Sequence, residues 1–148
     1  MCIAVDNDSV GDFCAATKPF IKEILRWINR GGRLAMSPAL AREVLLNRDF
    51  ARLVREWELQ DKVRNCDAHR VGEEQARVTP LCSSNDPHVI ALVNVAHVDA
   101  VVTKDKALIR DLKNTHLVGR RRRILKENEA NPARVDTHRR VLNRVQCP

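Results

Sequence analysis

Four acidic side chains that are far apart in the sequence have the residue types and positions of a metal site. They are Asp6, Glu43, Asp86 and Asp105. Carboxylates that pack close together repel one another unless a cation or a proton intervenes, so a converging set of this kind favours a bound divalent metal. With oxygen ligands alone, the metals that fit are Mg²⁺ and Mn²⁺.

Each of the four residues also has an ordinary structural explanation. Asp86 would be the N-cap of a helix, Asp105 a turn residue, Asp6 the end of a strand and Glu43 a solvated helix residue. Any one of these explanations is adequate alone, whereas the four residues together favour the metal site.

Histidine ligands are not expected. His88 is predicted to be a helix residue near the site, and the remaining histidines lack the spacing of metal ligands, so core or surface roles are favoured for all five. The other four are His69, His97, His116 and His138.

Short apolar runs predict the strands that would position the acidic residues. Residues 3–5 precede Asp6, residues 100–103 precede Asp105, and residues 33–36 form a third run. In open α/β sheets, ligands bind outside the carboxyl ends of the strands. The acidic side chains at these ends can therefore converge.

Helices are predicted between the strands. Thr17 is the expected N-cap of the first, which ends at Gly31-Gly32, and Ser37-Pro38 opens the helix that carries Glu43. Asn85-Asp86-Pro87 opens a helix that is apolar nearly all round and is expected to be buried. Strands alternating with helices predict an α/β fold with a mostly parallel central sheet.

The rest of the chain gives weaker signals. Residues 60–82 are polar and predict a helix pair or a helix with a loop, residues 120–125 an edge strand, and residues 134–145 a short basic helix. A length of 148 residues fits one domain. Its motif-bearing part would cover about residues 1–115, with a basic C-terminal extension at about 116–148.

The composition of the chain limits the classes of protein to which it can belong. No apolar run reaches the length of a membrane span, and the start of the chain turns acidic too early for a secretory signal. The five cysteines are odd in number and lack a C-x-x-C pair, so a disulfide framework or zinc site is not predicted, and reduced thiols in the cytoplasm are expected. They are Cys2, Cys14, Cys66, Cys82 and Cys147.

A net charge of +7 indicates a polyanionic partner such as RNA. The candidate RNA-binding residues are Arg120, Arg121, Arg122, Arg123 and Lys126, with further arginines at 134, 139, 140 and 144. Only 3% of residues are aromatic, so recognition of phosphates and shape should dominate over base stacking. A solvated basic surface is the alternative explanation of these charges.

An alternative enzymatic reading starts from Val5-Asp6-Asn7-Asp8-Ser9-Val10. This segment fits the D-x-D-x-[TV] opening of haloacid-dehalogenase-type phosphatases, in which the first Asp, here Asp6, accepts the phosphoryl group. Ser37, at the end of the next predicted strand, would correspond to the second motif of these phosphatases. The lysine that these enzymes use is not recognisable in a fitting context, and the chain is short for that fold.

The order of the four acidic sites resembles the PIN-domain nucleases. Their pattern is an Asp closing the first strand, a Glu in a helix after the second, an Asp opening a buried helix and an Asp after a late strand. The most specific match is Asn85-Asp86-Pro87-His88-Val89-Ile90-Ala91-Leu92, followed by residues 99–108. Weaker matches lie at residues 3–8 and 37–44.

The resemblance implies a three-layer α/β/α fold and a metal-dependent endoribonuclease. Asp6, Glu43, Asp86 and Asp105 would be the metal ligands and catalytic residues, with Asp8 and Thr103 in support. Position 8 is often Asn in the family, and Lys104, where a short polar residue is common, would pair with a neighbouring carboxylate.

Bacterial members of the family are often toxins of toxin–antitoxin pairs that form homodimers and are blocked by an antitoxin protein. A non-toxin RNA-processing nuclease and a non-catalytic RNA-binding module are the alternatives.

Overall fold

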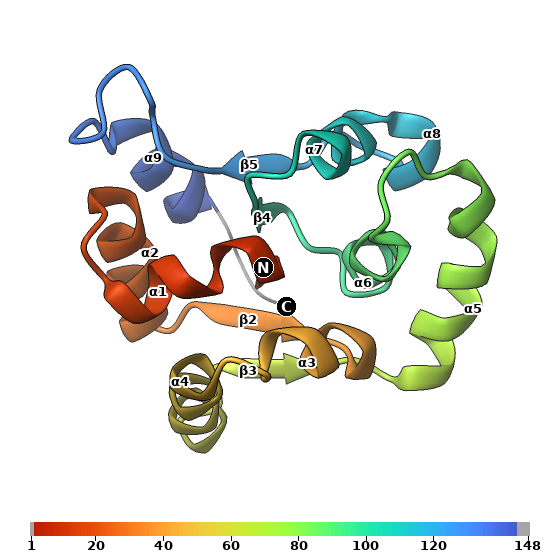
Figure 1. The fold of residues 1–148 in the computed structure, drawn as a ribbon, viewed down its shortest axis with the longest axis horizontal. Coiled ribbons are helices and arrows are strands. Elements are labelled where there is room, and N and C mark those ends of the chain that lie inside the picture. The colour runs from red at the N-terminus through yellow and green to blue at the C-terminus, as the bar shows by residue number, and fades with distance from the viewer. Residues whose placement is uncertain (1, 145–148) are drawn as a thin grey trace.

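Five parallel strands form one central sheet in the computed structural model, which describes residues 2–144. The order across the sheet is β3-β2-β1-β4-β5, from the bottom to the top of Figure 1. The strands are β1 (Cys2–Val5), β2 (Arg33–Met36), β3 (Val63–Asn65), β4 (Ala100–Val102) and β5 (Arg123–Leu125). The predicted α/β class is confirmed, and the sheet is wholly parallel.

Helices cover both faces of the sheet (Figure 1). One layer holds α1 (Val10–Ala15), α2 (Pro19–Asn29), α4 (Arg48–Leu59) and α9 (Asp136–Arg144). The other holds α5 (Ala68–Val78), α6 (Pro87–Val95), α7 (Lys106–Lys113) and α8 (Thr115–Val118). The short α3 (Pro38–Val44) contacts α6, and two 3-10 turns, η1 (Asn7–Ser9) and η2 (Thr79–Leu81), complete the chain.

The strand order reverses between β1 and β4, which are neighbours in the sheet although most of the chain lies between them. Val5 pairs with Val102 at their carboxyl ends, and the amide of Asp6 extends the ladder by donating to the carbonyl of Val102 at 3.0 Å. Chain crossovers on the two sides of this point run in opposite directions, which leaves a crevice outside the strand ends. Asp6 and Thr103 both lie there.

Local sequence signals explain where two of the helices begin and end. Ser37 caps α3, because its Oγ accepts a hydrogen bond from the amide of Leu40 at 3.3 Å. After α2, Gly31 adopts a φ of +103°, which side chains rarely tolerate. A Cβ on Gly32 would lie only 2.3 Å from the Trp27 ring, so glycine is required there too.

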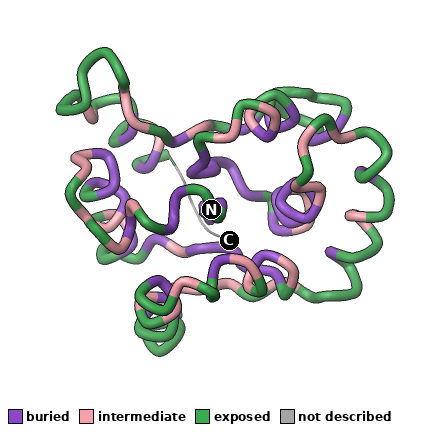
Figure 2. Tube along the Cα trace, viewed as in Figure 1, coloured by how far each residue is buried: buried purple, intermediate pink, exposed green. Residues whose placement is uncertain are grey.

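The core is continuous from the sheet into the helices that cover it (Figure 2). All described residues of β1 and β4 are buried, and so is most of α6, as its apolar sequence predicted. Phe13 on α1 makes edge-to-face contacts with Phe50 and Trp57, which join α1 to α4, and the two α4 rings contact each other in the same way.

Several sequence expectations need correction. The α2 helix is preceded by Lys18 at the cap position, without a side-chain cap, so the predicted role of Thr17 is wrong. Residues 60–82 contain strand β3 as well as helix α5, and the strand was missed because its three residues are polar or only partly buried. The predicted edge strand is confirmed as β5, and the basic helix as α9, although Val145 lies outside the described residues.

The cysteines also differ from expectation. Cys2 is disulfide-bonded, so the prediction that all five thiols are reduced is wrong. Cys14, Cys66 and Cys82 are free, and Cys147 lies outside the described residues. Within residues 2–144, the helices are all too short or too polar to span a membrane.

Candidate metal centre

Asp6 is held at the carboxyl end of β1 by hydrogen bonds to both of its carboxylate oxygens. Its Oδ1 accepts from the amide of Asn7 at 2.8 Å, and its Oδ2 accepts from Thr103 Oγ1 at 2.8 Å. Thr103 Oγ1 in turn accepts from the amide of Asp105 at 3.1 Å. Asp6 and Thr103 are both buried, so this chain of bonds fixes the junction of β1 and β4.

Asp105 follows β4 by three residues and lies at the N-cap of α7 rather than in the strand. Its Oδ1 accepts from the amides of Ala107 at 2.7 Å and Leu108 at 3.0 Å. The ordinary explanation made Asp105 a turn residue, whereas the structure gives it the helix-capping role that was expected of Asp86. The second carboxylate oxygen is left for other partners.

Asp86 occupies the N-cap position of α6 but does not cap the helix. Its side chain makes no cap hydrogen bond, unlike those of Asp67 and Asp105 at the starts of α5 and α7. Helix capping therefore does not account for an acidic residue at this position, and the Asp86 carboxylate is free to face the crevice.

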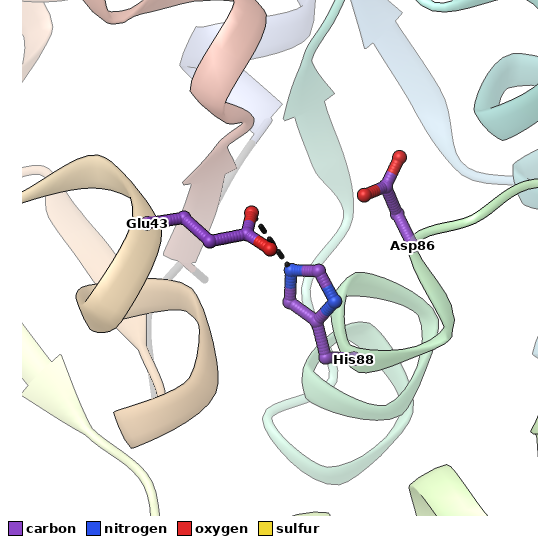
Figure 3. A group of neighbouring side chains, drawn as sticks. All are labelled: Glu43, Asp86 and His88. Carbon is purple, nitrogen blue, oxygen red and sulfur yellow. Dashed lines mark ion pairs between the residues drawn. The ribbon is translucent and has the colours of Figure 1, made fainter.

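Glu43 on α3 and His88 on α6 approach the same point as Asp86 (Figure 3). His88 Nε2 lies 3.2 Å from Glu43 Oε2, and one ligand atom from each of the three residues lies within 4.8 Å of the others. The His88 side chain is 8% exposed, and its Nε2 makes no hydrogen bond within the described chain because the geometry to Glu43 is unsuitable. A buried, unbonded nitrogen thus points at two carboxylates.

The electrostatics show that the acidic residues face one another. Burial raises the pKa of Asp6 to about 7, and the charges of Asp8 and Asp86 add to the rise against the opposing Thr103 and Asn7 hydrogen bonds. Burial also raises the pKa of Asp86, with contributions from Glu43, Asp105 and Asp8 that the charge of His88 partly offsets. Asp86 thus interacts electrostatically with Asp6, Glu43 and Asp105, but the group of close ligand atoms among the described residues is Glu43, Asp86 and His88, without Asp6 or Asp105.

No lysine or arginine forms an ion pair with these carboxylates anywhere in residues 2–144. Lys104 pairs with a neighbouring carboxylate, as expected, but that carboxylate is Asp12, at 3.4 Å. Lys18 contacts the same Asp12 oxygen at 3.3 Å. Asp12 thus holds these two lysines, and His88, which contacts Glu43, is the only basic side chain paired with the four carboxylates among the described residues.

Asp8 lies beside Asp6 in a supporting position. Its Oδ2 accepts from the amide of Lys104 at 3.0 Å, and its Oδ1 accepts from Ser9 Oγ at 2.8 Å. It therefore ties the η1 turn to the segment after β4, and it also adds negative charge to the cluster.

Asp111 on α7 positions the loop that presents Asp86. It accepts hydrogen bonds from the amide and hydroxyl of Ser83, at 3.0 and 2.7 Å, and from the amide of Ser84 at 2.9 Å. Burial acts to raise the pKa of Asp111, but these bonds outweigh it and lower the pKa. Sequence reasoning missed this residue, because nothing local links Asp111 to a loop 27 residues earlier.

The predicted RNA-binding residues lie elsewhere. Arg122 is buried and donates to the carbonyl of Val118 at 2.9 Å, and Arg120 pairs with Asp99. Arg121 and Arg123 are exposed on a cavity at the amino ends of β4 and β5, the opposite edge of the sheet from the carboxylates. Lys126 is exposed but is not among the residues that line this cavity.

The donor set fits a divalent cation. Glu43 and Asp86 supply carboxylate oxygens and His88 adds a nitrogen, all within 4.8 Å of one another, and this set suits Mn²⁺ and later transition metals better than Mg²⁺. His88 lies in a helix near the site, as predicted, but it was not predicted as a ligand, because its partner Glu43 comes from another helix. Its place in the first turn of an otherwise apolar buried helix was the available signal.

Comparison with known proteins adds no relative: no family model, no curated protein and no solved structure matches this chain. The resemblance to PIN-domain nucleases therefore rests on the sequence motifs alone.

Proposed function

We propose that this protein is a metal-dependent endoribonuclease that hydrolyses RNA phosphodiester bonds with Mg²⁺ or Mn²⁺. One observation supports the proposal most strongly. Asp86 interacts electrostatically with Asp6, Glu43 and Asp105 near the point where the strand order reverses, and none of the four has a lysine or arginine partner among the described residues. Like charges assembled in this way are stabilised by a bound cation.

Each residue has a distinct part in the proposed site. Asp86 and Glu43 would bind the cation together with His88. Asp6 at the end of β1 and Asp105 at the start of α7 would complete the ligand set. Thr103 holds the Asp6 carboxylate in place, and Asp111 holds the loop before Asp86. When bound, a divalent ion supplies activation of water and neutralisation of charge on the phosphodiester.

A phosphatase that uses Asp6 as a phosphoacceptor has less support. Both Asp6 oxygens accept hydrogen bonds, and a pKa of about 7 leaves the carboxylate partly protonated near neutrality, which weakens a nucleophile. Ser37, which that alternative needs as a phosphate ligand, is buried and caps α3.

Asp86→Asn tests the proposal. We expect wild type to cleave labelled single-stranded RNA with Mg²⁺ or Mn²⁺ and not with EDTA, and the variant to lose more than roughly a hundredfold in rate. Because Asp86 does not cap α6, the variant should keep its melting temperature. The matched control is Asp67→Asn, at a helix start where the side chain does cap, which should cleave normally.

Cleavage by neither metal, or equal cleavage by wild type and Asp86→Asn, would contradict the nuclease assignment. RNA binding without cleavage would instead support the non-catalytic RNA-binding module.

The biological setting belongs to the same proposal. We propose a toxin of a toxin–antitoxin pair, active as a homodimer and inhibited by a cognate antitoxin, with a non-toxin RNA-processing nuclease as the alternative. Growth arrest on expression, relieved by a co-purifying small protein, would separate the two. A cytoplasmic location is proposed with it, against which the disulfide at Cys2 is the contrary observation, since disulfides are rare in that compartment.

A further inference from the structure

A cavity of about 420 Å³ lies at the edge of the sheet opposite to the acidic cluster. Its walls come from the start of β5 and from one face of α9. The arginines that line it are Arg120, Arg121, Arg123, Arg140 and Arg144, and the remaining walls are Asp99, Thr137 and Val141.

The position of the cavity follows from the strand register. Asp99 precedes β4, and Arg123 begins β5 and pairs with Ala100, so both lie at the amino ends of their strands. Thr103 follows β4 at its carboxyl end, beside Asp6. At about 3.3 Å per residue, the strand separates the two edges by about 13 Å.

Positive charge in the cavity is only partly compensated. Asp99 is its single acidic wall residue, and it already pairs with Arg120 and, at 3.8 Å, with the neighbouring Arg122. The described residues provide no ion-pair partner for the other four arginines of the wall, which are Arg121, Arg123, Arg140 and Arg144. Unpaired guanidinium groups that converge on one hollow repel one another and favour a bound polyanion.

The arginines of helix α9 lie on two different faces of the helix. Arg139 faces α2 and donates to the buried Glu23, with its Nη2 at 2.9 Å from Oε1, while His138 and Leu142 are buried. Arg140 and Arg144, one turn apart, face the cavity instead. Their Cβ atoms are about 5–6 Å apart, which is comparable with the spacing of successive phosphates in a nucleic-acid strand.

We propose that this arginine cavity binds the phosphodiester backbone of RNA at a distance from the cleavage site. The proposal rests on the proposed nuclease function for the identity of the polyanion. Guanidinium groups bind phosphate oxygens through two parallel hydrogen bonds, and the cavity volume accommodates more than one phosphate group.

The lining favours RNA over an acidic protein segment. Among the described residues, Val141 is the only apolar residue of the wall, so this part of the cavity offers little to the apolar side chains of a peptide. The described lining also has no aromatic residue for base stacking, which predicts contacts to the backbone without sequence preference.

The separation of the two sites defines a substrate class. An RNA must span at least about 13 Å to place phosphates in the cavity and at the acidic cluster together. At about 5–6 Å between successive phosphates, this span requires at least four phosphates. A trinucleotide has only two phosphodiesters and is too short to bridge the two sites. Longer RNA is therefore the substrate that gains affinity from the cavity.

The test is RNA binding in EDTA, which does not require catalysis. A fluorescein-labelled 20-nucleotide RNA is titrated with wild type, with Arg121→Gln/Arg140→Gln, and with the control Arg48→Gln/Arg55→Gln, whose arginines are exposed on α4. We expect the cavity variant to weaken binding roughly fivefold or more and to reduce the salt slope by about 1.4, or 0.7 per lost phosphate contact. The control should match wild type.

Two outcomes would overturn the proposal. One is a cavity variant with the affinity and salt slope of the control. The other is a poly-glutamate peptide that binds wild type and loses more affinity than RNA in the cavity variant, which would assign the cavity to an acidic protein.

Cleavage gives a second readout in the full-length protein. The cavity variant should have a raised KM for the 20-nucleotide RNA and an unchanged kcat, while its KM for a trinucleotide stays that of wild type. An equal rise in KM for the 20-nucleotide RNA and for the trinucleotide would contradict a binding site at a distance from the cleavage site. Absence of any cleavage would refute the nuclease function. The binding measurement in EDTA would then decide by itself whether the cavity binds RNA.

Discussion

His88 Nε2 lies 3.2 Å from Glu43 Oε2, and this contact joins two helices that a strand and two further helices separate in the sequence. The imidazole is buried and its Nε2 has no hydrogen bond in the described chain. Leaving a buried polar atom unbonded is costly, and a metal ligand role would remove that cost.

The first prediction concerns metal preference. We expect Mn²⁺ to raise the melting temperature of wild type more than Mg²⁺ at equal concentration, because an imidazole nitrogen suits Mn²⁺ better. His88→Gln replaces the nitrogen donor by an oxygen donor of similar reach, so it should remove most of this difference. Melting curves over a metal titration measure both shifts.

His69→Gln is the matched control, since His69 is 80% exposed on α5. It should keep the wild-type difference between the metals. A His88→Gln protein that still distinguishes Mn²⁺ from Mg²⁺ as wild type does would show that His88 is not a ligand.

The second prediction concerns pH. Asp6 binds its proton more tightly in the folded protein, with a pKa of about 7, than at its usual value of 3.8. Its stabilising contribution is therefore complete below about pH 4 and is lost as the pH rises toward 7, by up to about 1.4 kcal/mol per pH unit. Urea denaturation of the metal-free protein across this range measures it.

Asp6→Asn isolates the effect, because other groups, such as Glu23 and Asp111 with their lowered pKa values, change stability in the opposite direction. The stability of wild type relative to Asp6→Asn should fall as the pH rises from 4 to 7. A constant difference would mean that Asp6 titrates normally.

The third prediction concerns Thr103, which donates to Asp6 at 2.8 Å and is fully buried. Thr103→Val keeps the shape but removes the hydroxyl, so we expect a loss of about 1–3 kcal/mol in the free energy of unfolding. It should also weaken Mn²⁺ binding, because the Asp6 carboxylate loses its anchor. Denaturant unfolding and calorimetric metal titration measure the two effects.

Thr103→Ser restores the hydroxyl and loses only a methyl group. Mn²⁺ affinity should therefore recover in this variant while some instability from the lost methyl remains. Equal Mn²⁺ affinity in the Val and Ser variants would exclude a positioning role for the hydroxyl.

Local sequence signals account for much of the fold. The apolar run before Asp6 and the apolar surface of α6 predicted burial that the structure confirms, because burial on all sides requires such composition. Strand β3 escaped prediction because it lies at an edge, where Val63-Arg64-Asn65 need not be apolar. Its place depends on pairing with β2, which no local signal encodes.

The candidate site was predictable only in part for the same reason. The acidic residues could be found because strand ends and helix starts mark their positions along the chain. The location of His88 near the site could be predicted as well, but not its contact with Glu43. The role of Asp111 could not be predicted, because Ser83 approaches it only after folding. Neither pairing has a characteristic spacing in the sequence.

Asp12, by holding both Lys18 and Lys104, has a consequence for the order of events in the proposed reaction. The protein carries a net charge of +7 and attracts RNA from a distance, yet the uncompensated carboxylates repel phosphates at close range. RNA would therefore stay bound to the basic surface until a cation has bound to the acidic cluster. The metal concentration would then set the rate at which bound RNA reaches the acidic cluster. The cation would bind to this cluster before the RNA does.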